Sequence, residues 1–384
     1  MFADRTNWDL TANRLSEALA EHEKLAKPLF DLTASNPTQC GFEYDSERIL
    51  QSLASPEALS YRPDPRGLEL SRRAVAEYYA EHDVKLDSAD ILLTTSTSEA
   101  YTFVFRLLCN PADQVLAPAP SYPLFDFLAD IQDVRLSPYP LLYDHNWQID
   151  FYALEQLITP RTRAVIVVHP NNPTGHFTKR DEMERLNDIC SKYSLALIAD
   201  EVFLDFFRKE KPSSFAANQD VLTFTLSGLS KIAGLPQLKA AWVVGSGPPE
   251  AKSQAVARLE IIADTYLSMN APVQLAMPSL LAERCYFQRQ VAARIQRNLD
   301  ELDRQLARQK SCSRLMVEGG WYAILRVPAT QADEDLAIKA LKENGVYVHP
   351  GNFYGFPSGG FLVVSLITRE DEFANGFARL LSSI

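Results

Sequence analysis

Short apolar runs alternate with amphipathic helical segments along the middle of the chain, from about residue 88 to residue 244. Several of these runs are apolar at consecutive positions, which is typical of strands whose two faces are both covered by helices. The pattern therefore predicts an α/β fold, a three-layer sandwich around a mostly parallel sheet. The predicted strands are residues 91–94, 115–117, 164–168, 195–199, 221–226 and 241–244.

The pattern changes after Pro272, where longer helical segments precede a second set of strands. We predict two helices there, at residues 274–281 and 284–310, and then a smaller α+β domain. The strands of this domain are predicted at residues 315–317, 321–327, 346–348 and 361–366, and its helices at residues 333–344 and 370–381.

The chain is accordingly predicted to divide into three parts. Residues 1–50 form an N-terminal arm and part of the small domain, with a helix at 11–25 and an extended stretch at 31–37. We expect this arm to pack on the small domain or on a neighbouring subunit. Residues 51–280 form the large domain, and residues 281–384 form the small domain. Within the large domain, Thr178 is predicted to cap a helix, with Asp181 three residues later.

Composition and charge exclude several classes of function. The 384 residues include 38 basic and 49 acidic side chains, and the net charge of −11 argues against a nucleic-acid partner. No secretory signal begins the chain and no apolar stretch is long enough to span a bilayer, so we predict no membrane association and a cytoplasmic location. The five cysteines and six histidines are scattered, so neither disulfides nor a metal site is expected.

Polar side chains follow the predicted strands, where α/β sheets bind their ligands. The first strand is followed by Ser96, Thr97 and Ser98, which open a helix. The free N–H groups of a helix start, together with these hydroxyls, form a cradle suited to a phosphate. Plain capping of the helix is the alternative explanation of the same residues.

Four further strand exits carry candidate chemistry. Asn172 follows one strand, and Asp200 ends the next, where a buried carboxylate needs a cationic partner. Tyr122 offers a flat face for a planar ring. Lys231 follows another strand, where desolvation favours a neutral, nucleophilic amine. A phosphate cradle, a ring stacker, an amide, a buried carboxylate and a lysine together match the needs of pyridoxal phosphate.

The motifs around these residues resemble those of the class I/II aminotransferases, within the fold-type I pyridoxal phosphate enzymes. They are Asn-Pro-Thr-Gly at 172–175, Asp-Glu-Val at 200–202 and Ser-Lys-x-x-Gly-Leu at 230–235, in that order and spacing. The segment Tyr-Arg-Pro-Asp-Pro-Arg-Gly-Leu at 61–68 is similar to a further family landmark. The resemblance covers roughly residues 31–384, and the joint occurrence of the motifs is specific.

The resemblance implies a role for each matching residue. Lys231 is the Schiff-base lysine and proton shuttle, Asp200 the partner of the pyridinium nitrogen, and Asn172 a hydrogen-bond partner of the ring oxygen. Tyr122 falls at the ring-stacking position. In a homodimer with shared active sites, Tyr61 reaches the cofactor phosphate of the neighbouring subunit. The remaining phosphate-contacting positions are Ser96, Thr97, Ser98 and Ser230.

Three positions depart from the family pattern. Lys239 stands where the family has an arginine that clamps the phosphate, and a point charge lacks the planar fork of arginine. Phe203 stands where a tyrosine donates to the ring oxygen. Val363 stands where an arginine grips the substrate carboxylate, so either Arg326 or Arg369 supplies that charge, or the substrate is bound differently.

The sequence thus predicts an aminotransferase that moves an amino group between an amino acid and a 2-oxo acid. Two alternatives stay open at this point. One is a C–S lyase or decarboxylase that uses the same cofactor, because the activated substrate can react in several ways. The other is a non-catalytic regulator that binds the cofactor, which the intact set of Lys231, Asp200 and Asn172 disfavours.

Overall fold

A mixed eight-stranded sheet forms the centre of the computed structural model, which describes residues 1–384. Five strands in the middle of this sheet are parallel, and the strands at its two edges run antiparallel to their neighbours. In spatial order the strands are β2 (Ile91–Thr94), β9 (Ala241–Ser246), β8 (Thr223–Gly228), β7 (Ala196–Asp200), β6 (Thr162–Val168), β3 (Gln114–Ala119), β4 (Arg135–Asp144) and β5 (Asn146–Ile149).

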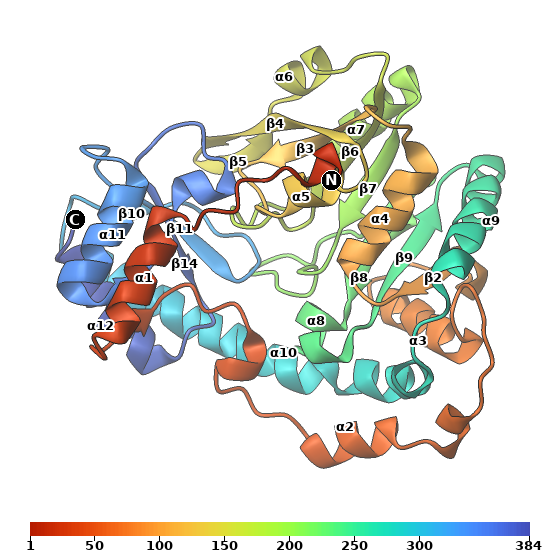
Figure 1. The fold of residues 1–384 in the computed structure, drawn as a ribbon, viewed down its shortest axis with the longest axis horizontal. Helices are drawn as coiled ribbons and strands as arrows, with labels where there is room; N and C mark the ends of the chain where they lie inside the picture. Colours follow the sequence, from red (N-terminus) through yellow and green to blue (C-terminus); the bar gives the residue numbers. More distant parts are fainter.

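Helices cover both faces of this sheet, which confirms the predicted three-layer sandwich (Figure 1). Successive side chains of one strand belong to different cores: Val165 and Val167 pack on one face of the sheet, and Ile166 and Val168 on the other. One face carries α4 (Thr97–Leu108), α5 (Phe125–Asp130) and α9 (Pro249–Tyr266). The opposite face carries α3 (Glu69–Ala80), α6 (Phe151–Gln156) and α7 (Arg180–Tyr193).

The sequence pattern missed strands β4 and β5. Pro138 and Pro140 lie within β4, and proline cannot donate to a sheet ladder, so this stretch does not have the pattern of an ordinary strand. In the structure these prolines pair with β3 only, because β5 joins the other edge of β4 from Leu141 onward. The far edge of β4 therefore has no strand partner at the prolines, where only the carbonyl of Pro140 is bonded, by the N–H of Asp150 at 3.0 Å.

The predicted cap of α7 was wrong. The helix begins at Arg180, and the carboxylate of Glu182 accepts a hydrogen bond from the N–H of Lys179 at 2.8 Å. The hydroxyl of Thr178 is buried without any hydrogen-bond partner.

The C-terminal part contains a four-stranded antiparallel sheet in the order β10 (Ser313–Arg314), β11 (Tyr322–Arg326), β14 (Phe361–Ser365) and β13 (His349–Pro350). A separate parallel pair joins β1 (Phe30–Asp31) to β12 (Val346–Tyr347). Two helices begin and end where the sequence predicted them, namely α11 (Asp333–Asn344) and α12 (Glu370–Leu381). The predicted strand at 315–317 lies just after β10 instead.

A single helix, α10 (Ala271–Leu306), replaces the two helices predicted between residues 274 and 310. It runs past both sheets along the lower side of the view in Figure 1. Pro278 lies inside it and has no N–H for the carbonyl of Gln274 one turn earlier. The hydroxyl of the buried Ser71 donates to this carbonyl at 2.5 Å, so the helix continues through the proline.

The N-terminal arm touches both parts of the molecule. Trp8 donates from its indole to Asp130 at the end of α5, beside the large sheet. Helix α1 (Arg14–Lys24) packs on α11, where Arg14 pairs with Asp335 at 2.7 Å. Helix α2 (Ser46–Leu53) lies against α10. The division of the chain at residues 50 and 281 stays a prediction, and α10 runs through residue 281 without a break.

No helix combines the length and the apolar character that crossing a membrane requires.

Replacing Ser71 by alanine is expected to lower the free energy of unfolding by about 1–2 kcal/mol, because the Gln274 carbonyl is left without a donor. In a Pro278→Ala background the new N–H serves this carbonyl, so the same change costs less there. Denaturant unfolding of the four proteins measures the coupling. Equal losses in both backgrounds would contradict this explanation of the continuous helix.

Candidate active site

The predicted site residues come from adjacent strands of the large sheet. Strand β7 lies between β6 and β8, and all three are parallel, so their carboxyl ends lie at one edge. Asp200 is the last residue of β7, and Lys231 lies in the short helix α8 (Leu229–Ile232) directly after β8. Asn172 follows β6 in the next loop. The fold thus brings the three residues to the same edge.

Lys231 is largely buried and has an apolar aromatic environment. Its Nζ atom lies 5.1 Å from the ring centroid of Trp321 and 5.7 Å from that of Phe203. Burial lowers the pKa of Lys231 to about 8, against the opposing effects of Asp200 and Cys40. No carboxylate lies within 4 Å of the amine. A lysine in this state is readily deprotonated, as a nucleophile requires.

Asp200 is 8% exposed and has no cationic side chain within 4 Å. Burial raises its pKa to about 6, although hydrogen bonds from Val202 and Tyr101 and the charge of Lys231 favour the carboxylate. Tyr101 donates to Oδ2 at 3.1 Å, and the N–H of Val202 bonds to Oδ1 at 3.1 Å. A buried carboxylate without a cationic partner is costly, so a cationic group of a ligand would stabilise Asp200.

Tyr101 is a site residue that the sequence did not single out. It lies on α4, one helical turn after Thr97, and its ring is fully buried. The helical spacing could have placed Tyr101 near the exit of the first strand. Its contact with Asp200, however, depends on how α4 packs across the sheet, which no local pattern encodes.

The side-chain amide of Asn172 makes no hydrogen bond within the chain. Its Oδ1 atom is buried and accepts no hydrogen bond. The neighbouring Asn171 instead stabilises the loop itself, because its Oδ1 accepts from the hydroxyl of Thr174 at 2.9 Å. A buried polar atom without a partner is unusual in a folded protein, so Asn172 is a candidate contact for a ligand.

Of the three residues expected to contact a phosphate at the start of α4, one caps the helix and two leave their N–H groups free. The hydroxyl of Ser96 accepts from the N–H of Glu99 at 3.1 Å, so this residue is an ordinary helix cap. Thr97 and Ser98 form the first turn of α4 and leave their N–H groups free. Ser230 is partly exposed next to Lys231. Lys239 is exposed and makes no ion pair.

Two predicted site tyrosines are accessible in the single chain. Tyr122 is 39% exposed, and the pKa of its phenol is raised by burial and by the nearby charge of Asp200. Tyr122 is therefore close enough to Asp200 to be affected by its charge, and it is partly accessible. Tyr61 is 79% exposed and lines a surface pocket with Leu70 and Asn270, which none of Lys231, Asp200 and Asn172 lines.

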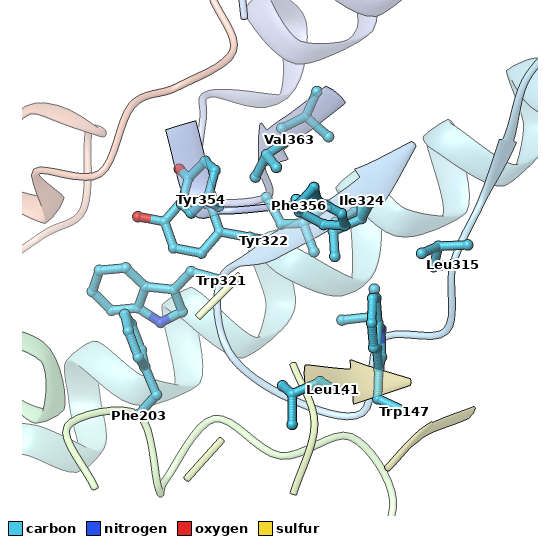
Figure 2. Packing of buried hydrophobic residues seen from close by; sticks show 14 of the residues in the cluster. Leu141, Trp147, Phe203, Leu315, Trp321, Tyr322, Ile324, Tyr354, Phe356 and Val363 are labelled. Carbon is cyan, nitrogen blue, oxygen red and sulfur yellow. The ribbon is translucent and has the colours of Figure 1, made fainter. Parts of the chain in front are cut away.

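The position of the missing arginine lies within a hydrophobic cluster. Val363 is 1% exposed and pairs across the small sheet with Ile324, and Figure 2 shows both beside Tyr322, Tyr354 and Trp321. The hydroxyl groups of Tyr322 and Tyr354 point to the same side of this cluster. The aromatic wall next to Lys231 therefore offers phenols and no fixed positive charge.

Neither alternative arginine occupies this wall. Arg326 is exposed at the end of β11, where its guanidinium lies over the rings of Tyr143 and Phe361. Arg369 precedes α12 and lies against Gly41, in the arm. No three histidine, cysteine or acidic side chains lie together in a way that could hold a metal ion.

Glu201 is also buried at this edge, but its environment is already complete. Its carboxylate accepts from the hydroxyl of Ser214 at 2.7 Å and from the N–H of Phe215 at 2.6 Å. Burial raises its pKa to about 8. Glu201 thus anchors the loop at 214–215 and leaves Asp200 as the carboxylate available to a ligand.

Residues 27–372 match the family model described as aminotransferase class I and II. The chain belongs to this family. It is 28% identical to the alanine aminotransferase of Mycobacterium tuberculosis over 92% of this chain and 84% of that protein. It is 28% identical to glutamate-pyruvate aminotransferase AlaA of Escherichia coli, over 71% of this chain and 68% of the relative.

Solved structures show the same fold. The alanine aminotransferase from Pyrococcus furiosus superimposes with a TM-score of 0.91 at 22% identity, covering 100% of this chain and 99% of that one. Membership of the family makes this aminotransferase a pyridoxal phosphate enzyme that acts on amino acids and 2-oxo acids. The lyase and regulator alternatives are therefore set aside. Two residues fit this cofactor: Asp200, a buried carboxylate without a cationic partner, and Asn172, whose side-chain amide has no hydrogen-bond partner.

Lys231→Met is expected to stabilise the cofactor-free aminotransferase by about 2 kcal/mol at pH 7, because an apolar side chain replaces a buried ammonium. The pKa of about 8 in the folded protein lies below the ordinary lysine value of 10.5. The buried ammonium of Lys231 therefore destabilises the folded protein fully below pH 8, and this destabilisation disappears by about pH 10.5.

Thermal unfolding at pH 7 and pH 10.5 tests the direction of this pH dependence. The gain from Lys231→Met should shrink at the higher pH. Lys85→Met, at an exposed position, is the matched control and should show no such pH dependence. A destabilised Lys231→Met protein at pH 7 would contradict the assigned environment.

Proposed function

We propose that Lys231 and Asp200 form the catalytic pair of this aminotransferase. The observation that carries the proposal is their placement: a buried amine and a buried carboxylate at the ends of adjacent parallel strands, each without a direct ion-pair partner. When bound, pyridoxal phosphate supplies an aldehyde that condenses with amines and a protonated ring that withdraws electrons from the substrate Cα.

Lys231 holds the cofactor and then moves a proton at the substrate Cα. Its low pKa supports this role, because a neutral amine can accept the Cα proton near neutral pH. The rings of Trp321 and Phe203 exclude water from one side of the amine. A dry environment keeps the proton on the productive path between amine and substrate.

Asp200 keeps a proton on the cofactor ring nitrogen. A buried carboxylate next to that nitrogen is more stable when it faces a positive charge, and the same attraction favours the protonated ring. Tyr101 orients the carboxylate through its hydrogen bond to Oδ2 and fixes the atom that stays available. Tyr101 therefore acts as a positioning residue.

The remaining predicted contacts hold the cofactor in place. We assign the phosphate to the free N–H groups of Thr97 and Ser98, with Ser230 and Lys239 nearby as side-chain donors. Ser96 contributes through the helix start that it caps. Tyr122 stacks on the ring, and Nδ2 of the Asn172 amide donates to the ring oxygen, at a position where Phe203 offers no donor.

The substrate carboxylate is held by uncharged donors. Tyr322 and Tyr354 present hydroxyls from the wall around Val363. The hydroxyl of Tyr354 also lies 3.0 Å from Nδ1 of His349, and the side chain of Ser35 lies at the Tyr322 hydroxyl. Neutral hydrogen bonds bind a carboxylate more weakly than a bidentate guanidinium does. The names of the bacterial relatives make alanine and pyruvate the first substrate pair to test.

A homodimer completes the site. Tyr61 is highly exposed beside other exposed apolar residues, Leu59 and Leu267, and the hydrogen bonds between Asp64 and Ser268 hold these two segments together. An exposed apolar surface of this kind is typical of a subunit interface. We propose that Tyr61 reaches the neighbouring subunit's phosphate site. A cytoplasmic location stays a prediction from the sequence.

Transamination is tested by the cofactor absorbance in the purified enzyme. A panel of amino acids, alanine first, should bleach the aldehyde band, and pyruvate or another 2-oxo acid should restore it. Lys231→Ala should lose at least about 10³-fold in turnover. Release of ammonia with no need for a 2-oxo acid would instead identify elimination and contradict the proposal.

Hybrid dimers test the role of Tyr61. Tyr61→Ala and Lys231→Ala chains are each expected to be nearly inactive alone. If Tyr61 serves the partner's site, co-refolded mixtures contain hybrids with one intact site and recover roughly a quarter of the wild-type rate. Mixtures as inactive as the single variants would show that Tyr61 serves only its own chain.

A further inference from the structure

A second cavity lies away from Lys231, where a loop and helix of the large sheet meet the segment that leads into the small sheet. Its volume is about 460 Å³, which is in the range of small-ligand sites. Residues 177–183 and 208–215 form one side, and residues 316–318 form the other. None of the residues assigned above to the cofactor or the substrate lines it.

The lining is strongly basic although the chain as a whole is acidic. Five basic and two acidic side chains face this cavity. Three of the basic residues already have carboxylate partners: Lys179 with Glu318, Arg180 with Glu184, and Lys211 with Asp83. The other two basic residues, Arg208 and Lys209, have no carboxylate within 4 Å.

Arg208 is the unusual member of this group. Its Nε atom is buried without a hydrogen-bond partner, and its one side-chain bond is a long one, 3.4 Å from Nη2 to the carbonyl of Gly320. Burial and the neighbouring Arg314 lower the pKa of Arg208 to about 10. A buried guanidinium without a counter-charge is costly, and an oxyanion would remove that cost.

Thr178 supplies a second unsatisfied group. Its hydroxyl is buried without a partner, because the N-terminus of α7 is served by Glu182 instead. Thr178 lines the same cavity as Arg208. A hydroxyl donor beside a free guanidinium is a combination that binds phosphate or carboxylate oxygens well.

We propose that this cavity binds a small organic anion with at least two negative charges, either a phosphate compound or a polycarboxylate. Arg208 forms the bidentate contact, Thr178 adds a hydroxyl and Lys209 adds charge at the mouth. The apolar part of the lining, Phe177, Met183 and Phe215, accommodates the carbon skeleton.

The site is connected to the active site through two short segments. The N–H of Arg208 bonds to the carbonyl of Glu318 at 3.0 Å, and the N–H of Gly320 bonds to the carbonyl of Phe206 at 2.8 Å. These segments end at Phe203 and Trp321, the two rings next to Lys231, which pack edge to face in Figure 2. An anion held by Arg208 would therefore act on the segment that leads to Phe203, and we expect its binding to change the KM of the amino donor.

Calorimetric titration of the cofactor-loaded enzyme tests the site, because the cofactor phosphate site is then filled. Pyrophosphate and citrate, at constant ionic strength, distinguish the two anion classes. One of them should bind saturably, once per chain, without releasing the cofactor. Arg208→Gln and the exposed Lys209→Gln should weaken binding, by at least about tenfold for Arg208→Gln. Arg73→Gln, an exposed helix arginine far along the chain, is the matched control and should bind normally.

Each contrary result overturns a defined part of the proposal. Absence of saturable binding by both anions, or equal binding by Arg208→Gln, overturns the site itself. Release of the cofactor during the titration, seen as loss of its absorbance band, would show that the anion uses the cofactor phosphate site. Saturable binding that leaves the KM of the amino donor unchanged would overturn the connection to Lys231.

Discussion

The structure depends on keeping an amine and a carboxylate in one buried site without letting them neutralise each other. Burial lowers the pKa of Lys231 and raises that of Asp200, so the charged form of each side chain is less stable here than in water. An apolar protein interior tolerates such groups only when something else satisfies them. A cofactor with an aldehyde at one end and a basic ring nitrogen at the other does so for both.

The α/β architecture makes this arrangement possible. Parallel strands end at the same edge, so residues distant in sequence, Asn172, Asp200 and Lys231, meet there without long connections. Tyr322 of the small sheet then closes the site, together with the neighbouring Trp321 and Tyr354. The long helix α10 runs past both sheets, and a hydroxyl from α3 allows it to continue through its own proline. The scaffold is therefore rigid where the reactive groups need fixed positions.

Much of this could be predicted from the sequence, because apolar runs and polar strand exits are local signals. Lys231, Asp200 and Asn172 each follow a clear strand, and α11 and α12 have clear helical spacing. Strand β4 was missed because its prolines hide a strand that pairs on one edge only over that stretch. The continuity of α10 was missed because a side chain from α3 replaces the lost hydrogen bond.

Features built by tertiary packing left no such signal. Tyr101 contacts Asp200 across 99 residues of sequence, and Trp321 reaches Lys231 from the other sheet. The basic cavity around Arg208 joins segments more than 100 residues apart, and its key property is a missing partner, which only a three-dimensional arrangement reveals. The aromatic surroundings of Val363 likewise follow from the pairing of β11 with β14 and the packing around it.

The covalent attachment of the cofactor is the most direct test of this account. Borohydride reduction of the cofactor-loaded protein, followed by peptide mass spectrometry, locates the modified side chain. The account predicts one pyridoxyl-phosphate adduct per chain, on Lys231. An adduct on another lysine, or no adduct in protein that has been saturated with the cofactor, would contradict it.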